Sequence, residues 1–299
     1  MAPDAKRLFL AEPLGFCGGV RRALEMFETF AAEHPGVTVY VLHELVHNST
    51  VTDSMRRRNA VFVDSLDDVP DGACILFGAH GISASIEEEA RRRNLVYCDS
   101  VCPLVLKLQR NAADSPEDLP LILFGDAQHP EVRSVLGWAR SRQVHVLSEL
   151  KDIDSLPSMR KALFLCQTTR NQEQVRSLSE LLKERIPGLV DKSKVCDAVS
   201  RRQNAVAELS PLCDLMLVVG SPHSSNGRRL LAIAREKCRR SAMVENGGEI
   251  TEDLVGAARN VGISAATSTP DSAIGAVVAK FESFGFVRAD GEKGPCHAG

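Results

Sequence analysis

Three cysteines share a setting that suits a metal centre. Cys17 lies in GFCGG, Cys102 in DSVCPLV and Cys196 in SKVCDAVSRRQ, and each stands between a strand-like or loop segment and a helical pattern. A helix N-terminus favours the thiolate, which is the form of cysteine that binds metals. Because the three lie about one third of the chain apart, they would converge if each third formed a small lobe.

Three thiolates can hold an iron–sulfur cluster and leave one iron without a protein ligand, open to a substrate. A zinc site with three cysteines and one histidine is the alternative soft-metal site. Scattered structural thiols fit the spacing equally well. The cysteines by themselves therefore leave these three interpretations open.

The other cysteines do not suggest a second site. The nine cysteines of the chain are an odd number at wide spacings, unlike a compact disulfide scaffold, and no CxxC pair indicates a zinc ribbon or a thioredoxin-type motif. Structural cysteines usually behave as small buried hydrophobic residues. We expect such buried thiols at Cys74, Cys98, Cys213 and Cys238.

Three histidines in turn-like contexts and one polar triplet suit a phosphate ligand. The histidines are His47 in LVHNST, His80 in GAHGIS and His129 in AQHPEV, and the triplet is Ser224, Ser225 and Asn226. Imidazoles and hydroxyls donate hydrogen bonds to phosphoryl oxygens without requiring a basic surface. Each histidine alone could equally be a solvated loop residue, whereas the set together predicts a diphosphate pocket.

Glu131 follows His129 by two residues and could deliver protons to a ligand in such a pocket. A glutamate near a helix N-terminus is also stabilised by the helix dipole. Both interpretations fit the sequence.

The elements around these residues are short strands that alternate with amphipathic helices. Helical patterns begin near Val20 and Asp271, and another runs from Val175 to Ile186. Strand after helix after strand predicts parallel βαβ units, and hence an α/β protein. The expected strands are 37–42, 61–64, 73–77, 119–124, 144–147, 162–166, 214–220 and 260–264.

Several of these strands run into loops with small polar residues just before a helix, as in ILFGAHGIS and LMLVVGSPHSSNGRRL. The carboxyl ends of parallel strands and the helix N-termini that follow them are where α/β proteins bind ligands. We therefore expect the polar residues to line one crevice.

Length and composition further limit the kinds of protein that this chain can be. The 299 residues exceed one compact core, which predicts two or three lobes. A net charge of −3 without a basic stripe argues against a nucleic-acid partner. The start of the chain has no apolar signal region, and no stretch approaches the roughly 20 apolar residues of a membrane span. We expect a cytoplasmic protein.

The chain carries, in order over nearly its whole length, the motifs GFCGGVRRALE, ELVHN, AHG, CPLV, HPEV, QTT, VGSPHSSNGRRL and STPDS. This ordered set resembles the 4-hydroxy-3-methylbut-2-enyl diphosphate reductases, the LytB-type family of the last step of the methylerythritol phosphate route to isoprenoids. The resemblance implies three small α/β lobes in a pseudo-threefold trefoil around a central [4Fe–4S] cluster. The lobes would span 15–101, 102–195 and 196–299, with 1–14 completing the third.

The resemblance also implies roles for individual residues. Cys17, Cys102 and Cys196 would be the cluster ligands, Glu131 the proton relay and Thr168 the hydroxyl beside the substrate's alcohol. Gly18 and Gly19 would let the backbone approach the cluster closely. The diphosphate pocket would comprise His47, His80, His129, Ser224, Ser225, Asn226 and Ser268.

The implied reaction is reductive dehydroxylation of (E)-4-hydroxy-3-methylbut-2-enyl diphosphate to isopentenyl and dimethylallyl diphosphate. The electrons would come from a ferredoxin or flavodoxin, because the chain shows no nucleotide fingerprint: GAHG at 78–81 is not a GxGxxG motif.

Three segments depart from the family's usual motifs. Two alternatives follow: a divergent paralogue that reduces a different activated alcohol in specialised metabolism, and a non-catalytic iron–sulfur redox sensor. A sensor would need neither the Glu131 and Thr168 pair nor the SSN triplet. The departing residues are Asp126, Arg133, Arg170, Asn171, Asp197, Val199 and Arg201.

Overall fold

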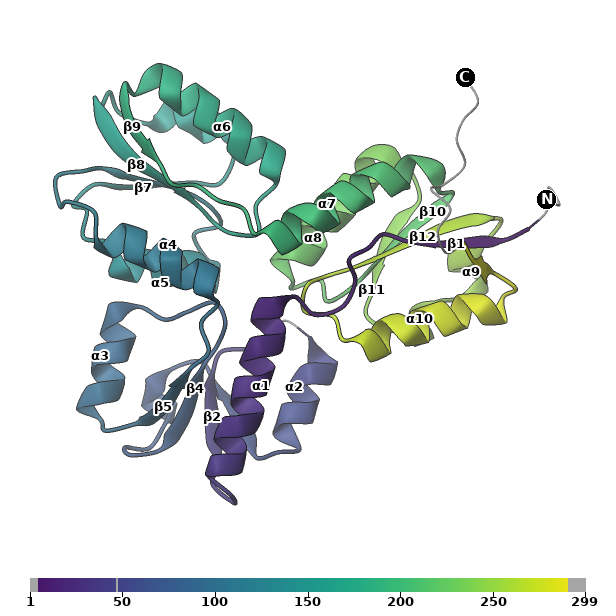
Figure 1. Cartoon of the computed structure of the whole chain (residues 1–299), viewed down its shortest axis with the longest axis horizontal. Helices are drawn as coiled ribbons and strands as arrows, with labels where there is room; N and C mark the ends of the chain where they lie inside the picture. Colours follow the sequence, from purple (N-terminus) through teal and green to yellow (C-terminus); the bar gives the residue numbers. More distant parts are fainter. Residues whose placement is uncertain (1–4, 47, 290–299) are drawn as a thin grey trace. The chain divides into compact units, whose positions relative to one another are not determined.

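The computed structural model describes residues 5–46 and 48–289. These residues form two compact units (Figure 1). The first unit comprises 5–17, 48–49 and 197–289, and the second comprises 18–46 and 50–196. Each unit is described by itself below.

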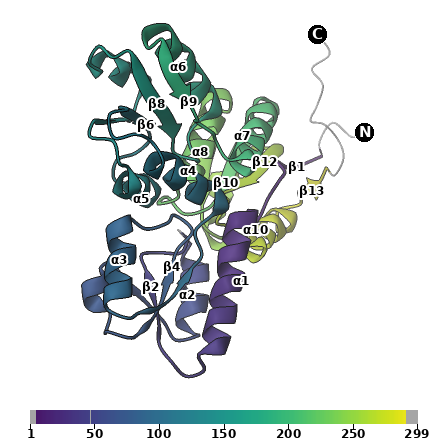
Figure 2. The same cartoon turned by 60° about the vertical axis from the view of Figure 1, so that its left-hand side comes forward.

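The second unit contains two four-stranded sheets, and every strand pair in them is parallel. The sheet nearer the N-terminus has the order β3-β2-β4-β5. Helices α1 and α3 lie on opposite sides of this sheet in both views (Figures 1 and 2). Its elements are α1 (Gly18–Glu33), β2 (Val39–Leu42), α2 (Ser49–Arg56), β3 (Ala60–Val63), the 3-10 helix η1 (Leu66–Asp68), β4 (Cys74–Phe77), α3 (Ala84–Arg92) and β5 (Val96–Asp99).

The other sheet of the second unit has the order β7-β6-β8-β9. Its two central strands, β6 and β8, are almost fully buried. Its elements are α4 (Pro103–Ala113), β6 (Leu121–Phe124), α5 (Pro130–Trp138), β7 (Val144–Leu147), η2 (Leu150–Ser155), β8 (Lys161–Cys166), α6 (Gln172–Arg185) and β9 (Gly188–Asp191).

The first unit holds one five-stranded parallel sheet of order β11-β10-β12-β1-β13. The N-terminal strand β1 (Arg7–Leu10) therefore lies in the sheet formed by the C-terminal part of the chain. The other elements are α7 (Asp197–Leu209), η3 (Ser210–Leu212), β10 (Leu215–Val219), α8 (Ser225–Lys237), β11 (Ser241–Val244), η4 (Gly247–Glu249), α9 (Glu252–Val255), β12 (Asn260–Ala265), α10 (Asp271–Ser283) and β13 (Val287–Arg288).

Strand β10 shows why this sheet is covered on both faces. Successive side chains of a strand point to opposite faces of its sheet. Leu215, Leu217 and Val219 join the apolar cluster that contains α10, whereas Met216 and Val218 join the cluster that contains α7 and α8. A strand that buries both faces reads as a continuous apolar run, as 214–220 does in the sequence.

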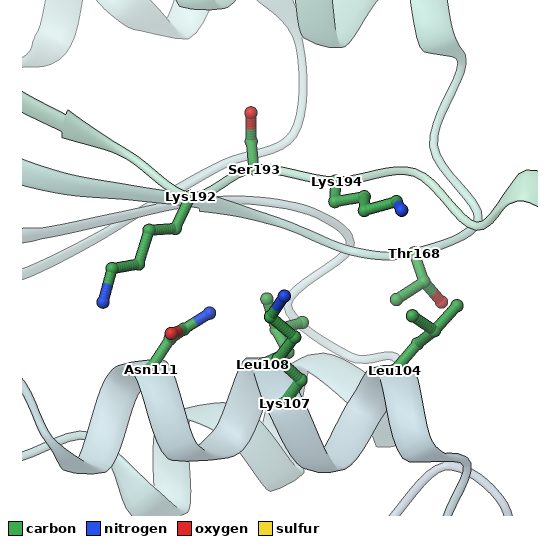
Figure 3. Close-up of a pocket in the computed structure, with 8 residues that line it drawn as sticks. All are labelled: Leu104, Lys107, Leu108, Asn111, Thr168, Lys192, Ser193 and Lys194. Carbon is green, nitrogen blue, oxygen red and sulfur yellow. The ribbon is translucent and has the colours of Figure 1, made fainter.

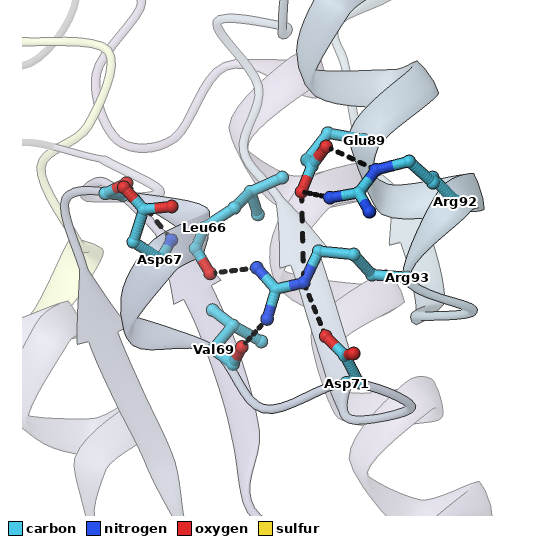
Figure 4. Close-up of polar contacts among 8 residues, drawn as sticks. Leu66, Asp67, Val69, Asp71, Glu89, Arg92 and Arg93 are labelled. Atoms are coloured by element: carbon cyan, nitrogen blue, oxygen red, sulfur yellow. Dashed lines mark hydrogen bonds and ion pairs between the residues drawn. The ribbon is translucent and has the colours of Figure 1, made fainter.

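Beside the sheet β3-β2-β4-β5, Arg93 joins the end of α3 to the loop after β3 (Figure 4). Its guanidinium donates to the carbonyls of Leu66 (2.6 Å) and Val69 and pairs with Asp71 (2.6 Å). Glu89 bridges Arg93 (4.0 Å) and a neighbouring arginine of α3. This network fastens the C-terminal end of α3 to the segment between β3 and β4.

The α/β class with parallel sheets is confirmed, and all eight expected strands are present. The edge strands β9 and β11 were not expected, because half-exposed strands carry no continuous apolar run. Among the cysteines, Cys74 and Cys238 are buried as expected, but Cys98 and Cys213 are only partly buried. No helix within the described residues is long and apolar enough to cross a bilayer.

Candidate active site

The three cysteines proposed as ligands occupy equivalent places in the three sheets. In each case the amide of the cysteine donates a hydrogen bond to the carbonyl two residues beyond the end of a strand, namely β12, β4 or β8. The three bonds, donor first, are Cys17 to Thr267 (3.1 Å), Cys102 to Ala79 (3.0 Å) and Cys196 to Thr168 (2.9 Å). The repetition extends from strand order to single hydrogen bonds.

Each of these cysteines also directly precedes a helix, as the sequence predicts. Cys17 is followed by α1 and Cys196 by α7, while Cys102 is the N-cap residue of α4, with Pro103 at the first helical position. None of these three cysteines forms a disulfide bond, and all three are partly exposed.

The remaining described cysteines differ in chemistry. Burial raises the pKa of the Cys74 and Cys98 thiols and raises that of Cys166 and Cys213 to about 12. A thiol that holds its proton is a poor metal ligand. The donor set that fits a metal centre is therefore the one at the helix N-termini.

The structure places these cysteines in both units: Cys17 in the first, Cys102 and Cys196 in the second. Within residues 5–46 and 48–289, no three His, Cys, Asp or Glu side chains are grouped to hold a metal ion. The structure thus fixes each thiol relative to the strand ends of its own unit.

Glu131 and Thr168 form the most distinctive polar pair of the second unit. Glu131, in the first turn of α5, is 2% exposed. The backbone amide of Thr168 donates to one carboxyl oxygen (2.6 Å) and the Thr168 hydroxyl donates to the other (2.9 Å). Burial raises the pKa of Glu131 to about 7 against the opposing effect of these two hydrogen bonds. Near neutral pH this carboxyl can therefore both hold and release a proton.

His80 and His129 lie edge to face, with ring centroids 5.2 Å apart. His80 lies between β4 and α3, and His129 is the N-cap residue of α5. The Nδ1 atom of His129 accepts a hydrogen bond from the amide of Glu131 (3.2 Å). A neutral imidazole whose Nδ1 accepts carries its proton on Nε2, where it can be donated to a ligand.

The loop that carries His80 is held by side chains of α4 and α5. Gly81 in this loop has a φ of +77°, and a Cβ there would lie 2.5 Å from the amide nitrogen of Gln109. Only glycine fits both the backbone conformation and the close approach. The three donors to the loop are Ser134 to the His80 carbonyl (2.9 Å), Trp138 to the Ile82 carbonyl (2.7 Å) and Gln109 to the Ile82 carbonyl (3.0 Å).

In the first unit, the expected phosphate-binding residues gather at the ends of β10 and β12. Ser224 is the N-cap residue of α8, and its hydroxyl accepts from the amide of Gly227 (3.1 Å). Ser225 and Asn226 form the first turn of α8, and Ser268 lies between β12 and α10. Free backbone N–H groups and the dipole make such a helix start suitable for an anion.

Two of these side chains are buried without a polar contact. Asn226 is 2% exposed and Ser268 is 7% exposed. The amide nitrogen and oxygen of the Asn226 side chain have no hydrogen-bond partner among the described residues. The same is true of the Ser268 hydroxyl. Burying a polar group without a partner is costly, and such groups are usually satisfied by a ligand or water. Ser268 also follows Thr267, the residue that accepts from Cys17.

The residues that the sequence analysis predicted for one crevice thus fall into two groups. His80, His129, Glu131 and Thr168 lie in the second unit, whereas Asn226 and its neighbours lie in the first. His47 lies outside the described residues.

Two departures from the usual motifs have structural roles. The Arg170 guanidinium lies over the ring of Phe124, 3.9 Å from its centroid, and donates to the carbonyl of Ser148 (2.5 Å). Asn171 is the N-cap residue of α6 and accepts from the amide of Gln174 (3.0 Å). These residues stabilise the sheet of β6 to β9 and are accounted for without a changed ligand.

The other departures also have simple positions. Asp126 accepts from the amide of Gln128 in a turn (3.0 Å), and Val199 is a buried apolar residue of α7. The exposed ones, at helix surfaces, are Arg133, Asp197 and Arg201.

Sequence reasoning missed one buried residue that holds the site together. Arg202 of α7 is 2% exposed. Its guanidinium donates to the carbonyls of Ala198 (2.8 Å) and Gly15 (2.7 Å), which stand two residues from Cys196 and Cys17. The neighbouring Arg201 has the same side chain, and only the helical periodicity of buried positions distinguishes the two.

Comparison with known proteins shows the family to which this chain belongs. A family model described as LytB protein matches residues 8–282. The 4-hydroxy-3-methylbut-2-enyl diphosphate reductase of Methylococcus capsulatus is 36% identical over 285 residues, covering 93% of this chain and 91% of that protein. The protein of that name from Haemophilus influenzae (strain PittEE) is 36% identical over 286 residues, with the same coverage.

Solved structures show the same fold. The E-1-hydroxy-2-methyl-but-2-enyl-4-diphosphate reductase from Plasmodium falciparum superposes with a TM-score of 0.85 at 28% identity, covering 98% of this chain and 95% of that one. A second structure, titled (E)-4-hydroxy-3-methyl-but-2-enyl diphosphate reductase, the terminal enzyme of the non-mevalonate pathway, gives 0.67 at 28% identity, covering 93% and 99%. Because the family model and the relatives each match most of its length, the chain belongs to the LytB protein family.

Proposed function

We propose that this protein reduces (E)-4-hydroxy-3-methylbut-2-enyl diphosphate to isopentenyl and dimethylallyl diphosphate. The observation that carries the proposal is the repeated placement of a cysteine in all three sheets: its amide is hydrogen-bonded just beyond a strand end, and a helix follows it. The names of the relatives supply the substrate.

Cys17, Cys102 and Cys196 would hold a [4Fe–4S] cluster. The donor set fits: three partly exposed thiols outside any disulfide stand at helix N-termini, while burial raises the pKa of four other thiols. Three ligands for four irons leave one iron open, as a substrate alcohol requires. When bound, the cluster supplies electrons and a Lewis-acidic site, whereas this chain's residues supply binding and protons.

The diphosphate would be bound by His80, His129 and the residues at the start of α8, with Ser268 and His47. Support comes from the buried Asn226 amide and Ser268 hydroxyl, which find no partner among the described residues. A phosphoryl oxygen could accept from the Nδ2 group of Asn226 and from the Ser268 hydroxyl, and an Nε2 proton of His129 suits an acceptor of the same kind.

Glu131 and Thr168 would deliver the proton. In the ionised state, Glu131 accepts from the Thr168 hydroxyl. In the protonated state, the carboxyl can donate to the hydroxyl oxygen, which turns the hydroxyl hydrogen toward the substrate's alcohol. A pKa of about 7 makes both states accessible near neutral pH.

The overall reaction is balanced by two electrons and two protons. The C–O bond of the alcohol breaks and its oxygen leaves as hydroxide, which one proton converts to water. The carbon skeleton takes up the two supplied electrons and the second proton. A ferredoxin or flavodoxin would supply the electrons one at a time.

The test is anaerobic turnover by protein loaded with iron and sulfide, with reduced methyl viologen as electron donor. We expect both isopentenyl and dimethylallyl diphosphate as products, and none without the cluster. A fully loaded protein that forms neither product would overturn the proposal. Reduction of other phosphorylated allylic alcohols would then indicate a paralogue, and failure with all of them a redox sensor.

A further inference from the structure

Two cysteine-bearing segments are each fastened by an arginine of a neighbouring helix. In the second unit, Arg22 of α1 donates to the carbonyl of Val101, the residue before Cys102 (3.1 Å). In the first unit, Arg202 of α7 donates to the carbonyl of Gly15 (2.7 Å), just before the GFC motif. Each arginine stands five or six residues after the cysteine that precedes its own helix. We call the boundary between such a helix and the cysteine-bearing segment beside it a seam. In these two seams a direct hydrogen bond joins the helix to the segment.

The third seam is open. Lys107 of α4 stands five residues after Cys102, the position equivalent to the two arginines. Among the described residues, no hydrogen bond joins its side chain to the segment that precedes Cys196. Instead, a cavity of about 370 Å³ separates α4 from residues 192–194 (Figure 3). Its lining residues are Leu104, Lys107, Leu108, Asn111, Thr168, Lys192, Ser193 and Lys194.

The open seam is cationic. Lys107, Lys192 and Lys194 are exposed, and no carboxylate lines the cavity. Figure 3 shows Lys107 and Asn111 extending from α4 toward the opposite wall, with Lys192 pointing toward Asn111 and Lys194 directed along the wall toward Thr168. The net charge of the chain is −3, so these three lysines create a local region of positive potential on it. We call these three lysines and the cavity between them the cationic seam.

The floor of the cationic seam adjoins two of the three proposed cluster ligands. Leu104 stands two residues after Cys102, and Lys194 stands two residues before Cys196. Thr168, at one end of the cavity, accepts the hydrogen bond from the amide of Cys196 (2.9 Å). A protein that docks here therefore lies close to the segments that carry Cys102 and Cys196.

We propose that the cationic seam is the docking surface for an acidic one-electron carrier protein. The inference rests on the proposed function, which requires such a carrier. Each docking event oxidises the carrier by one electron and reduces the centre by one, so two events supply the pair that one turnover consumes.

Exposure of the lysines favours a protein over a small anion as the occupant. Small-ligand sites place a few preset polar groups in a largely buried cavity. Exposed charges around an apolar centre, here Leu104 and Leu108, instead steer transient encounters and accelerate association. Electron-transfer complexes are typically small and weak, as a surface of this size allows.

The first test is a binding titration of an acidic flavodoxin onto the cluster-loaded protein at low ionic strength. The variants are Lys107→Glu and Lys192→Glu. The matched control is Arg176→Glu, which reverses an exposed charge on α6 of the same unit. We expect each lysine variant to raise the Kd roughly tenfold and to reduce its salt dependence, with little change in the control. Equal Kd values in all three variants, or no binding by the unaltered protein, would overturn the proposal.

Kinetics separate this inference from the proposed function. The lysine variants should raise the KM for flavodoxin while turnover with methyl viologen stays within about twofold, because the small donor needs no docking. If the unaltered protein fails with methyl viologen as well, the proposed function fails, and the titration still decides the docking. Inorganic pyrophosphate binding that Lys107→Glu abolishes without a change in flavodoxin affinity would assign the cationic seam to a small anion and refute the inference.

Discussion

The carbonyl of Thr168 accepts the amide of Cys196 at 2.9 Å, while the same threonine holds both carboxyl oxygens of Glu131. A single residue, two positions beyond the end of β8, thus joins a proposed cluster ligand to a buried acid. A proton carried by Glu131 is thereby held next to the segment where electrons would arrive. This coupling of acid and ligand through one backbone position underlies the first prediction.

Replacing Glu131 by glutamine should abolish turnover without preventing substrate binding. Glutamine keeps the size of the side chain but cannot hold a transferable proton, and loss of a general acid lowers kcat by roughly 10²–10⁴-fold. Single-turnover measurements under anaerobic conditions give kcat, and a spectroscopic titration with substrate gives the Kd. In the unaltered protein, kcat should fall as pH rises above about 7, because the acid form of Glu131 is then lost. A variant with full turnover would exclude the relay.

Glu131 should also make the stability of the cluster-free protein depend on pH. Its folded pKa of about 7 lies above the unfolded value near 4.5, so the folded state keeps a proton that the unfolded chain releases between those values. The free energy of unfolding should therefore be highest below the unfolded pKa, fall as pH rises to about 7, and then level off. The fall amounts to about 3 kcal/mol.

Urea titrations at several pH values, on the unaltered protein and on Glu131→Gln, measure this contribution as the difference between the two curves. Parallel curves would mean that the carboxyl ionises normally in the folded protein.

Ser268→Ala should weaken anion binding without weakening the fold. Removing a buried hydroxyl that has no partner among the described residues leaves stability unchanged or raises it. The adjacent Thr269 is the matched control, because its hydroxyl donates to the carbonyl of Val219 (2.8 Å). Thr269→Val should cost about 1 kcal/mol of stability.

Calorimetric titration with inorganic pyrophosphate distinguishes the two positions. Ser268→Ala should raise the Kd for pyrophosphate roughly fivefold, the loss of one hydrogen bond, whereas Thr269→Val should leave it nearly unchanged. The reverse pattern would remove Ser268 from the phosphate site.

Arg202→Met should loosen two cysteine-bearing segments together. Its guanidinium bonds the carbonyls of Ala198 and Gly15. Leaving the buried Gly15 carbonyl without this donor costs roughly 1–3 kcal/mol. Arg201→Met, at the exposed neighbouring position, should stay within about 0.5 kcal/mol. Urea unfolding measures the stability, and the rate of iron loss to a chelator reports on the centre. Equal behaviour of the two variants would show that Arg202 is not a positioning residue.

The sequence predicted the elements whose side chains are buried on both faces and missed those at sheet edges. Continuous apolar runs such as 162–166 and 214–220 predicted central strands. The strands β9 and β11 are partly exposed and have no continuous apolar run in the sequence. The resemblance implied that 1–14 completes the third lobe. Register and sheet order depend on contacts between distant segments, so the pairing of β1 with β12 is known only from the structure.

The sequence predicted which residues belong to the candidate site, but not which of them are buried or which hydrogen bonds they form. The position of Glu131 near a helix N-terminus gives no sign of its burial, which depends on Thr168, 37 residues away. Arg202 and Arg201 are identical in type, and only tertiary packing buries the first. Lys107 became noticeable only because the equivalent positions at Arg22 and Arg202 make hydrogen bonds that it does not share.

The most direct test of the account is the iron and sulfide content of anaerobically reconstituted cysteine-to-serine variants. Cys17→Ser, Cys102→Ser and Cys196→Ser should each lose the brown colour and most of the bound iron, because each removes one of three ligands. Cys213→Ser should keep both, because burial raises the pKa of that thiol to about 12. A colourless Cys213→Ser protein beside a fully loaded Cys196→Ser protein would contradict the assignment of the centre.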